Sequence, residues 1–380
     1  MSSIIDAHVH LWDPERGDYG WLTRDLPTLY RRFDARELQE QLTGAGVRGA
    51  VLVQAAPTEA ESDYLLAIAE WTPWVQGVVG WVDFDAPDIE QRVAKRAQQP
   101  KFVGVRPMLQ DIDDADWILH PGRDRALSAL ASHALVFEAL IKPVHMTRIE
   151  QIARRYPNLS IVIDHAAKPA IGNEVSRSWR ESLRALASYP NVACKLSGLL
   201  TELTPGVDSA KVLGCAEVVL QLFGPSRVIW GSDWPVLTLA STYEQWYALT
   251  QRALSSLSEA DRNAVLGDNA ARIYRMKKIP DAPAAILLHP DDSVLVCCRA
   301  VRAGERFNVN DHEELHVLQD IDLGHKLARR GLSVGEKVIK YGAPIGSMTA
   351  AVPAGGWVHL HNMKSDYISA HTRAARVDAT

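Results

Sequence analysis

Short apolar runs alternate with longer amphipathic segments throughout residues 4–233 of this chain. The short runs have the length and composition of buried strands, and apolar residues recur at helical spacing in the segments between them. Such alternation is typical of parallel strands joined by right-handed helical crossovers. Strands are predicted over residues 4–11, 49–54, 75–82, 102–106, 136–141, 160–165, 192–197 and 228–233. Helices are predicted over residues 35–44, 59–70, 88–97, 146–155, 178–188 and 211–222.

Eight strand–helix units within about 230 residues predict an α/β fold of the (β/α)8, or TIM, barrel type. A doubly wound open sheet is the alternative, but it would not place polar residues at so many strand ends. These polar residues are, in chain order, His8 with His10, Gln54, Asp83, Arg106, Glu138, His165, Lys195 with Ser197, and Asp233. Each could form a structural ion pair or hydrogen bond on its own. Because barrel enzymes carry their chemistry where strands meet the following loops, we expect them to meet in one site.

The first predicted strand contains the sequence Asp-Ala-His-Val-His. If this strand alternates regularly, Asp6, His8 and His10 share its inner face. Its outer face would then consist of Ile5, Ala7, Val9 and Leu11. Two histidines at i and i+2 near the C-terminal end of a strand can bind one metal ion through neutral nitrogens. The alternative is a pair of core histidines satisfied by hydrogen bonds.

Residues 12–33 form a connection that is too long for a simple strand–helix loop. It holds four aromatic residues, Trp12, Tyr19, Trp21 and Tyr30. The segment is therefore expected to be ordered, either as a lid over a site or as a plug in the mouth of the barrel.

The composition argues against several classes of protein. A formal net charge of −5 gives no reason to expect nucleic acid or an anionic membrane as a partner. No apolar run reaches the ~18 residues of a membrane span, and the first strand leaves no room for a signal peptide. The four cysteines show no CxxC spacing and fit reduced thiols better than a disulfide framework. We therefore expect a cytoplasmic protein.

Five motifs of the first 277 residues resemble the amidohydrolase superfamily. They are Asp-Ala-His-Val-His-Leu-Trp (6–12), Val-Ile-Asp-His-Ala-Ala-Lys-Pro (162–169), Cys-Lys-Leu-Ser-Gly-Leu (194–199), Trp-Gly-Ser-Asp-Trp-Pro-Val (230–236) and Asp-Asn-Ala-Ala-Arg-Ile-Tyr (268–274). More narrowly, they resemble its sugar-lactonase branch, which includes L-rhamnono- and L-fucono-lactonases. The resemblance implies a barrel over residues 1–277 that acts on small sugar lactones.

The same resemblance implies a set of site residues. The metal ligands would be His8, His10, His165 and Asp233, with Glu138 as a further candidate. Many relatives carry a histidine on the fifth strand where this chain has Glu138, which leaves the number of metal ions and the need for metal open. Lys195 does not occupy the position of a carbamylated bridging lysine, so we expect one divalent ion, with zinc favoured by the nitrogen-rich set.

The expected reaction is hydrolysis of a sugar-acid lactone. Asp233 would act as general base and then general acid, and the other catalytic residues would be His165 and Lys195. Arg106 and Lys195 suit the carbonyl or its developing oxyanion. The predicted substrate-binding residues are Arg106, Gln54, Trp12, Trp234 and Ser197. Two alternatives remain open: a decarboxylase or C–C hydrolase with similar ligands, and a non-catalytic barrel that serves as a binding subunit of a dehydratase.

The pattern changes after residue 277. Residues 278–286 read as a linker, residues 287–365 as a small β-rich domain, and residues 366–380 as a flexible tail. A loose Val-x-Ala-Gly-Glu phrase recurs at 301–305, 332–336 and 352–356.

Three segments of this region carry a second resemblance. Residues 322–328, 338–346 and 357–362 resemble the small SAF-type (β-clip) domain of altronate and galactarate dehydratases. That resemblance implies a link to sugar-acid dehydration. His325, Lys326, His359 and His361 would face a separate dehydratase large subunit or its substrate, although the three histidines could instead form a polar or metal site of their own.

Overall fold

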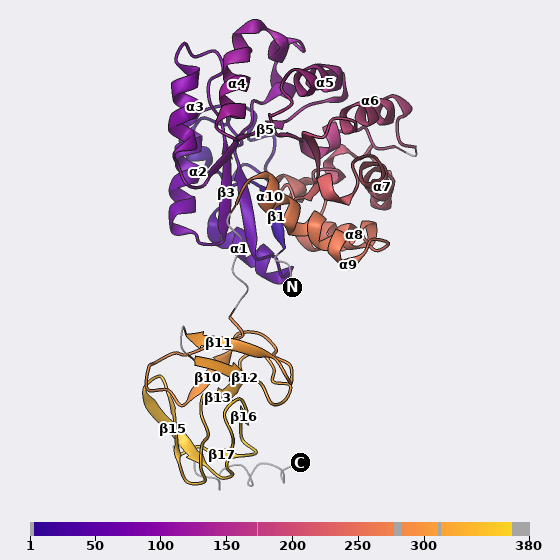
Figure 1. The fold of residues 1–380 in the computed structure, drawn as a ribbon. Coiled ribbons are helices and arrows are strands. Elements are labelled where there is room, and N and C mark those ends of the chain that lie inside the picture. The colour runs from indigo at the N-terminus through magenta and orange to yellow at the C-terminus, as the bar shows by residue number, and fades with distance from the viewer. Residues whose placement is uncertain (1–3, 173, 277–282, 311–312, 367–380) are drawn as a thin grey trace. The chain divides into compact units, whose positions relative to one another are not determined.

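The computed structural model describes residues 4–172, 174–276, 283–310 and 313–366 (Figure 1). The chain divides into two compact units, residues 1–279 and 280–380. Most of the predicted linker and nearly all of the predicted tail lie outside the described residues.

The first unit contains an eight-stranded parallel sheet in which each strand pairs with its neighbours in chain order. The strands are β1 (Ile5–Val9), β2 (Gly49–Val53), β3 (Val75–Gly80), β4 (Phe102–Val105), β5 (Val136–Ala139), β6 (Ile161–Ile163), β7 (Val192–Leu196) and β8 (Val228–Trp230). The sheet closes between its first and last strands, because the backbone N–H of His10 donates to Trp234 and that of Asp233 donates to His8. The predicted TIM-type barrel is confirmed, and the open sheet is wrong.

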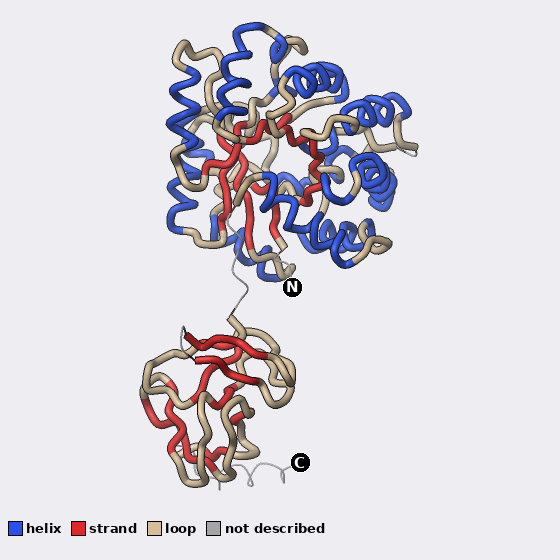
Figure 2. Tube along the Cα trace, viewed as in Figure 1, coloured by secondary structure: helices blue, strands red, loops and turns tan. Residues whose placement is uncertain are grey.

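Eight main helices alternate with these strands along the chain, and Figure 2 shows helices around the ring of strands. They are α1 (Ala35–Gly44), α2 (Glu59–Trp71), α3 (Ile89–Ala97), α4 (Asp124–Ser132), α5 (Met146–Arg155), α6 (Arg177–Ala187), α7 (Val212–Phe223) and α8 (Tyr243–Ala253). Side-chain caps fix several helix starts: Asp34 accepts from two backbone N–H groups of α1, and Thr58 accepts from one in α2. Among the described residues, no helix is long and apolar enough to cross a membrane.

The barrel interior is filled by small branched side chains, such as Val53, Val79, Val136 and Ile229. The opposite faces of the strands pack against the surrounding helices in a separate and larger cluster. A short helical run, α9 (Glu259–Asn263), a π-helical turn (Ala264–Asp268) and α10 (Asn269–Ile273), follows α8. Ala270 and Tyr274 from this run join the interior cluster, so they close one end of the barrel.

The first strand does not alternate regularly. Asp6 pairs with Ala50 of β2 and Val9 pairs with Leu52, so β1 contains one more residue than β2 between these two pairs. This bulge turns both Ala7 and His8 inward.

The prediction that Asp6 shares a face with the two histidines is therefore wrong. Asp6 is buried on the helix side, where it accepts hydrogen bonds from Tyr243 of α8 and from the backbone of Ser232. Ile5 and Ala7, predicted on the outer face, lie in the barrel interior.

The second unit is built from short strands. They are β9 (Ala285–Ile286), β10 (Val294–Cys297), β11 (Arg306–Asn310), β12 (Glu313–His316), β13 (Lys326–Ala328), β14 (Lys337–Lys340), β15 (Ala343–Met348), β16 (Trp357–Val358) and β17 (Met363–Lys364). They form sheets of four, two and three strands. Each copy of the recurring Val-x-Ala-Gly phrase makes the same turn, with Gly304, Gly335 and Gly355 at φ between 80° and 85°. The backbone N–H of each glycine donates to a neighbouring segment at 2.8 Å, so the repeat encodes a turn that only glycine adopts readily.

Candidate metal and catalytic site

Three imidazole rings and one carboxylate converge where β1, β6 and β8 end. Nε2 of His8 lies 3.2 Å from Nε2 of His10. Oδ1 of Asp233 lies 3.2 Å from Nε2 of His10 and 3.6 Å from Nε2 of His8. The same oxygen lies 3.9 Å from Nε2 of His165. All four side chains are buried, and we call them the histidine–aspartate cluster.

The donor atoms of this cluster fit a metal ion. His10 donates its Nδ1 hydrogen to the carbonyl oxygen of Val53 at 2.8 Å, which leaves the lone pair of its Nε2 facing the cluster. Ligand atoms of His8, His165 and Asp233 all lie within 4.8 Å of one another. Imidazole nitrogens completed by one carboxylate are a typical zinc ligand set. The cluster is therefore suited to a single divalent ion.

His165 reaches the cluster through a left-handed turn. Strand β6 ends at Ile163, two residues before the predicted end, and residues 165–168 all have φ between 50° and 59°. In residues other than glycine this conformation costs roughly 1–2 kcal/mol each. The turn is held by the indole N–H of Trp179, which donates to the carbonyl of Ala166 at 2.8 Å. His165 Nδ1 also lies 2.9 Å from the hydroxyl of Ser197.

Gly198 leaves the room that this arrangement needs. Its φ is +60°, and a Cβ there would lie 2.8 Å from Cγ of His165 and 3.0 Å from Oδ2 of Asp233. Any other residue would push on both groups, so the backbone after β7 must carry a glycine here.

A second layer of charged groups lies behind His8. Nζ of Lys195 lies 2.8 Å from Glu138 Oε1, 3.2 Å from Asp164 Oδ1 and 3.1 Å from His8 Nδ1. His8, Glu138 and Asp164 would by themselves also have the spacing of a metal site. The lysine ammonium already occupies the position of a cation among them, which agrees with a cluster for one metal ion rather than two.

Burial and these charges shift several pKa values. Burial and the nearby charge of Lys195 hold the pKa of His8 well below its usual range, so this ring is neutral and able to bind metal. Burial alone would raise the pKa of Asp164, but the nearby charges, first that of Lys195 and then that of Arg106, outweigh burial and hold this pKa well below its usual range. Burial and the charge of Asp164 raise the pKa of Glu138. Burial would also raise the pKa of Asp233, yet the imidazoles around it, first His165, lower it, so Asp233 is ionised.

A cavity of about 210 Å³ opens onto the histidine–aspartate cluster. His10, His165 and Asp233 line it, together with Arg106 and Lys168. Arg106 is fixed by Gln54, whose side-chain oxygen accepts from Nε at 3.1 Å and from Nη2 at 2.9 Å. Nη1 of Arg106 lies 3.3 Å from Asp164 Oδ2. The cavity thus combines a carboxylate, imidazoles and fixed cations.

Seven of the predicted site residues do not line this cavity: His8, Lys195, Glu138, Gln54, Ser197, Trp12 and Trp234. Each is at most 2% exposed. The indole N–H of Trp12 donates to the carbonyls of Leu29 and Arg31, so Trp12 fixes the 12–33 segment rather than facing the cavity. Trp234 packs edge-on against Phe33. Asp83 lies apart from the histidine–aspartate cluster, in the wall of a neighbouring cavity.

Other residues of the site were missed by the sequence analysis. Asp164 was overlooked because its neighbour His165 carried the motif. Tyr274, whose hydroxyl donates to Glu138, lies more than a hundred residues away in sequence. Lys168 lies in the same motif as His165, and only the left-handed turn brings it to the cavity. A signal existed for Asp164 and Tyr274, since both belong to the quoted motifs, but their spacing does not reveal their partners.

Comparison with known proteins identifies the family of this barrel. The sequence model of the family described as "Amidohydrolase" matches residues 5–276. The chain belongs to the amidohydrolase family. An amidohydrolase of Burkholderia multivorans, solved with bound zinc, is 32% identical with a TM-score of 0.69, and the match covers 73% of this chain and 100% of that one. The L-fucono-1,5-lactonase of Burkholderia ambifaria is 43% identical over 282 residues, 73% of this chain and 97% of that protein.

The second unit matches a different family. The model of the altronate/galactarate dehydratase SAF domain matches residues 283–366 of this amidohydrolase. The alpha subunit of (2R)-sulfolactate sulfo-lyase from Paracoccus pantotrophus is 43% identical over 56 residues, which are 15% of this chain and 84% of that subunit. The predicted SAF-type domain is therefore confirmed.

Proposed function

We propose that the barrel hydrolyses the ring ester of a sugar-acid lactone. The observation that carries the proposal is the histidine–aspartate cluster, which opens together with Arg106 onto a cavity small enough for one sugar ring. The lactonase from Burkholderia ambifaria supports the substrate class, because it is similar over nearly its whole length.

The cluster of His8, His10, His165 and Asp233 would hold one divalent ion. We favour zinc, because the ligand set is rich in nitrogen and a 32% identical relative was solved with zinc bound. A bound ion supplies Lewis acidity toward an ester carbonyl. Glu138, predicted as a further ligand, is already engaged by Lys195 and Tyr274.

The reaction needs one proton to be moved twice. As water adds to the lactone carbonyl carbon, the carboxylate of Asp233 accepts a proton from it. The bond from the carbonyl carbon to the ring oxygen then breaks, and Asp233 returns the proton to that oxygen. Ring opening yields a hydroxy acid, which ionises and releases a proton to solution at neutral pH.

The cationic groups have distinct tasks in this proposal. Arg106 lies in the cavity wall with its guanidinium held by Gln54, so it can donate to a substrate oxygen without being reoriented. Lys195 is fully buried and does not line the cavity. Lys195 is therefore a positioning residue, which holds His8 from behind.

Metal content and turnover of a lactone panel, measured on the same samples, test this function. We expect about one equivalent of metal by elemental analysis and stoichiometric proton release from at least one aldonolactone. The double variant His8→Ala/His10→Ala should lose the metal and the activity together. His133→Ala is the matched control, because His133 is exposed and lies outside the cluster.

Two outcomes would contradict the proposal. Release of CO2 from a carboxylated substrate, without lactone hydrolysis, would favour the decarboxylase alternative. Full activity in metal-free protein would transfer polarisation of the carbonyl from a metal ion to Arg106.

We further propose that the SAF-type domain docks a separate dehydratase large subunit. In the sulfo-lyase, the similar chain is by name one subunit of a larger enzyme. In this chain, the ring of Trp357 stacks on His359 at 5.3 Å and its N–H donates to His325 at 3.2 Å. Two leucines close to these residues in the sequence are exposed, Leu323 by 66% and Leu360 by 58%. We call these five residues the histidine–tryptophan patch.

The patch has the character of a protein contact more than of a metal site. Among the described residues, two sets of three His, Asp or Glu side chains have ligand atoms within 4.8 Å of one another, as a metal site requires. Both sets lie in the barrel. Exposed apolar side chains mark protein contacts where they gather in one patch, and tryptophan is enriched among the residues that contribute most to binding. The docked enzyme would consume a sugar acid, which is also what lactone hydrolysis yields, so tethering would raise the local concentration of one active site near the other.

Truncation after Lys278 tests the role of this domain. The barrel alone should retain lactone hydrolysis within a few-fold, because the first unit is compact by itself. Co-purification with a dehydratase large subunit should be lost on truncation and also in full-length Leu360→Asp. Val334→Asp is the matched control, since Val334 is at least as exposed as Leu360 but lies outside the patch. Loss of lactone hydrolysis in a folded, truncated barrel would show that this domain serves the first active site.

A further inference from the structure

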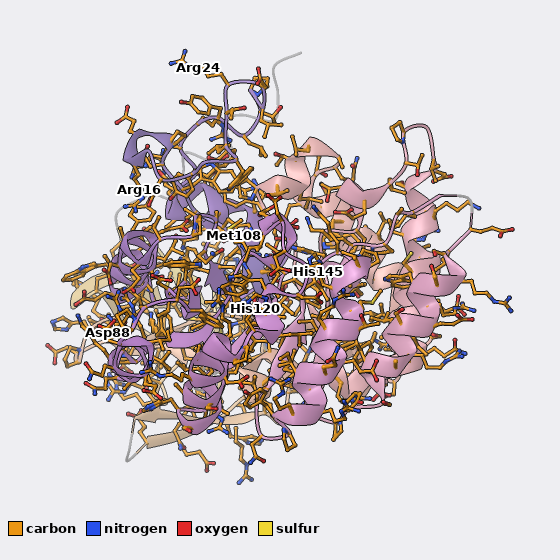
Figure 3. All side chains as sticks on the ribbon, turned by 90° about the horizontal axis from the view of Figure 1, so that it is seen from above. Arg16, Arg24, Asp88, Met108, His120 and His145 are labelled. Carbon is orange, nitrogen blue, oxygen red and sulfur yellow. The ribbon has the colours of Figure 1, made fainter. Side chains whose placement is uncertain are left out.

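A second and larger cavity adjoins the catalytic one. Its volume is about 500 Å³, and it lies beyond the ends of β3 and β4. Trp21, Met108 and Asp111 line both cavities, so the two share a wall. In Figure 3 Met108 lies toward the middle of the view, whereas Arg24 and Asp88 lie at its edge. The reaction proposed for Asp233 uses none of the remaining residues of this second cavity.

The walls of this cavity are aromatic and held in place. Trp117 stacks with the ring of Phe84 at 6.0 Å, and the guanidinium of Arg123 lies 4.4 Å from the indole centroid. Trp21 is fixed by its indole N–H, which donates to the carbonyl of Ala55 at 2.7 Å. Trp81 adds a third, half-buried indole. Flat, immobilised aromatic faces of this kind bind a ligand with little loss of side-chain entropy.

Carboxylates stand beside the aromatic rings. Two of them are neutralised, since Asp85 pairs with Arg123 and Asp18 pairs with Arg16. Asp83 and Asp111 form no ion pair with the residues that the structure describes. Oδ1 of Asp83 accepts from the backbone of Asp85, and Oδ2 of Asp111 accepts weakly from Gln110 at 3.3 Å. Both can therefore accept hydrogen bonds from a ligand.

We infer that this cavity binds a neutral glycosyl group attached to the lactone, so that the enzyme acts on lactones derived from disaccharides. The inference rests on the proposed lactonase function. A sugar ring offers an apolar C–H face to an indole and hydroxyl donors to a carboxylate, which are the two chemistries that this cavity presents. The catalytic cavity, about 210 Å³, is smaller than most sites for larger ligands, while about 500 Å³ more lies directly beyond Trp21 and Met108.

The charged side chains of the second cavity limit which chemical group it can bind. A glycosyl unit that carries its own carboxylate would meet the unpaired charges of Asp83 and Asp111 and be disfavoured. A purely apolar group would bury those carboxylates without hydrogen bonds, at a cost. A neutral, polyhydroxylated ring avoids both penalties.

Kinetics with two lactones test the inference. A monosaccharide aldonolactone and the lactone of a neutral disaccharide are compared in the full-length, metal-loaded enzyme. We expect wild type to show a KM at least 5-fold lower for the disaccharide lactone. Trp81→Leu and Asp83→Asn should each raise that KM about 3-fold or more, toward the value for the monosaccharide lactone, and leave kcat and KM for the monosaccharide lactone within 2-fold. Both residues line the second cavity and not the catalytic one.

The chain offers a matched control for each variant. Trp71→Leu removes an indole that is 83% exposed, and Asp113→Asn removes an exposed carboxylate. Neither control should change either KM. Equal KM values for the two lactones in wild type, or equal effects of Trp81→Leu on both, would overturn the inference.

A binding measurement separates this inference from the proposed function. If neither lactone is hydrolysed, the lactonase proposal fails and a non-reactive methyl glycoside of a neutral disaccharide is titrated against tryptophan fluorescence. A saturable change that is lost in Trp81→Leu but kept in Trp71→Leu supports a glycosyl site. No change in wild type overturns it.

Discussion

Asp233→Asn lowers kcat for the best lactone by about 10²- to 10⁴-fold, the range for a positioned proton transfer. The amide keeps the size of the side chain but cannot accept the proton from water. The cavity and the hydrogen bonds of the neighbouring backbone should be unchanged, because they do not depend on the charge. The measurement is kcat at saturating lactone, with the folded state checked by circular dichroism.

The control must separate proton transfer from metal binding, since Asp233 is also a proposed ligand. Metal content is therefore measured on the same samples, and kcat is expressed per bound ion. Asp113→Asn serves as the matched variant, because it removes an exposed carboxylate far from this chemistry in the chain. A variant at position 233 that keeps near-full turnover would end the assignment of Asp233 as the acid–base group.

Lys195→Met lowers the free energy of unfolding by about 3–5 kcal/mol, the usual cost of removing one partner from a buried ion pair. The change leaves Glu138 and Asp164 in the barrel interior without their shared cation. Methionine fills a similar length, so lost volume contributes little. Urea unfolding followed by fluorescence measures the effect as a shift of the midpoint.

Two further variants identify the cause. Glu138→Gln in the Lys195→Met background should restore part of the lost stability, because it removes one of the uncompensated charges. Lys168→Met is the matched control: Lys168 is partly exposed and lies 3.6 Å from Glu202, so its loss should cost less than about 1 kcal/mol. If Lys195→Met unfolds at the same urea concentration as wild type, the buried carboxylates do not depend on this lysine.

The architecture could be predicted from the sequence because burial imposes a regular pattern on the positions of apolar residues. The strands that form β2 to β8 are covered on both faces, so they appear as apolar runs, and the helices between them keep one apolar side. The convergence of His8, His10, His165 and Asp233 was also predicted, since all four follow or end parallel strands that meet at one rim. Their assignment as metal ligands remains a prediction.

Contacts within the site could not be predicted from the sequence, because they depend on the path of the backbone. Gln54, Ser197 and Trp12 carry polar atoms, which suggested contact with a substrate. In the structure those atoms are used to hold Arg106, His165 and the 12–33 segment. A side-chain donor serves a ligand or a neighbour equally well, and only the geometry distinguishes the two. The same holds for Asp164, whose carboxylate is used to hold the ammonium of Lys195 at 3.2 Å.

The bulge in β1 makes the length of this strand as important as its composition. Three residues of β1 span the distance that two residues of β2 span, and the surplus residue brings His8 to the inner face. Loss of a single codon between Asp6 and Val9 would restore regular alternation while every remaining side chain stayed the same. The number of imidazoles that face the cluster then depends on which residue is lost: without Ala7 both His8 and His10 would still face inward, whereas without His8 only His10 would. The surplus residue therefore allows Ala7 and His8 to lie on the same side of the strand, which a strand of regular alternation cannot do.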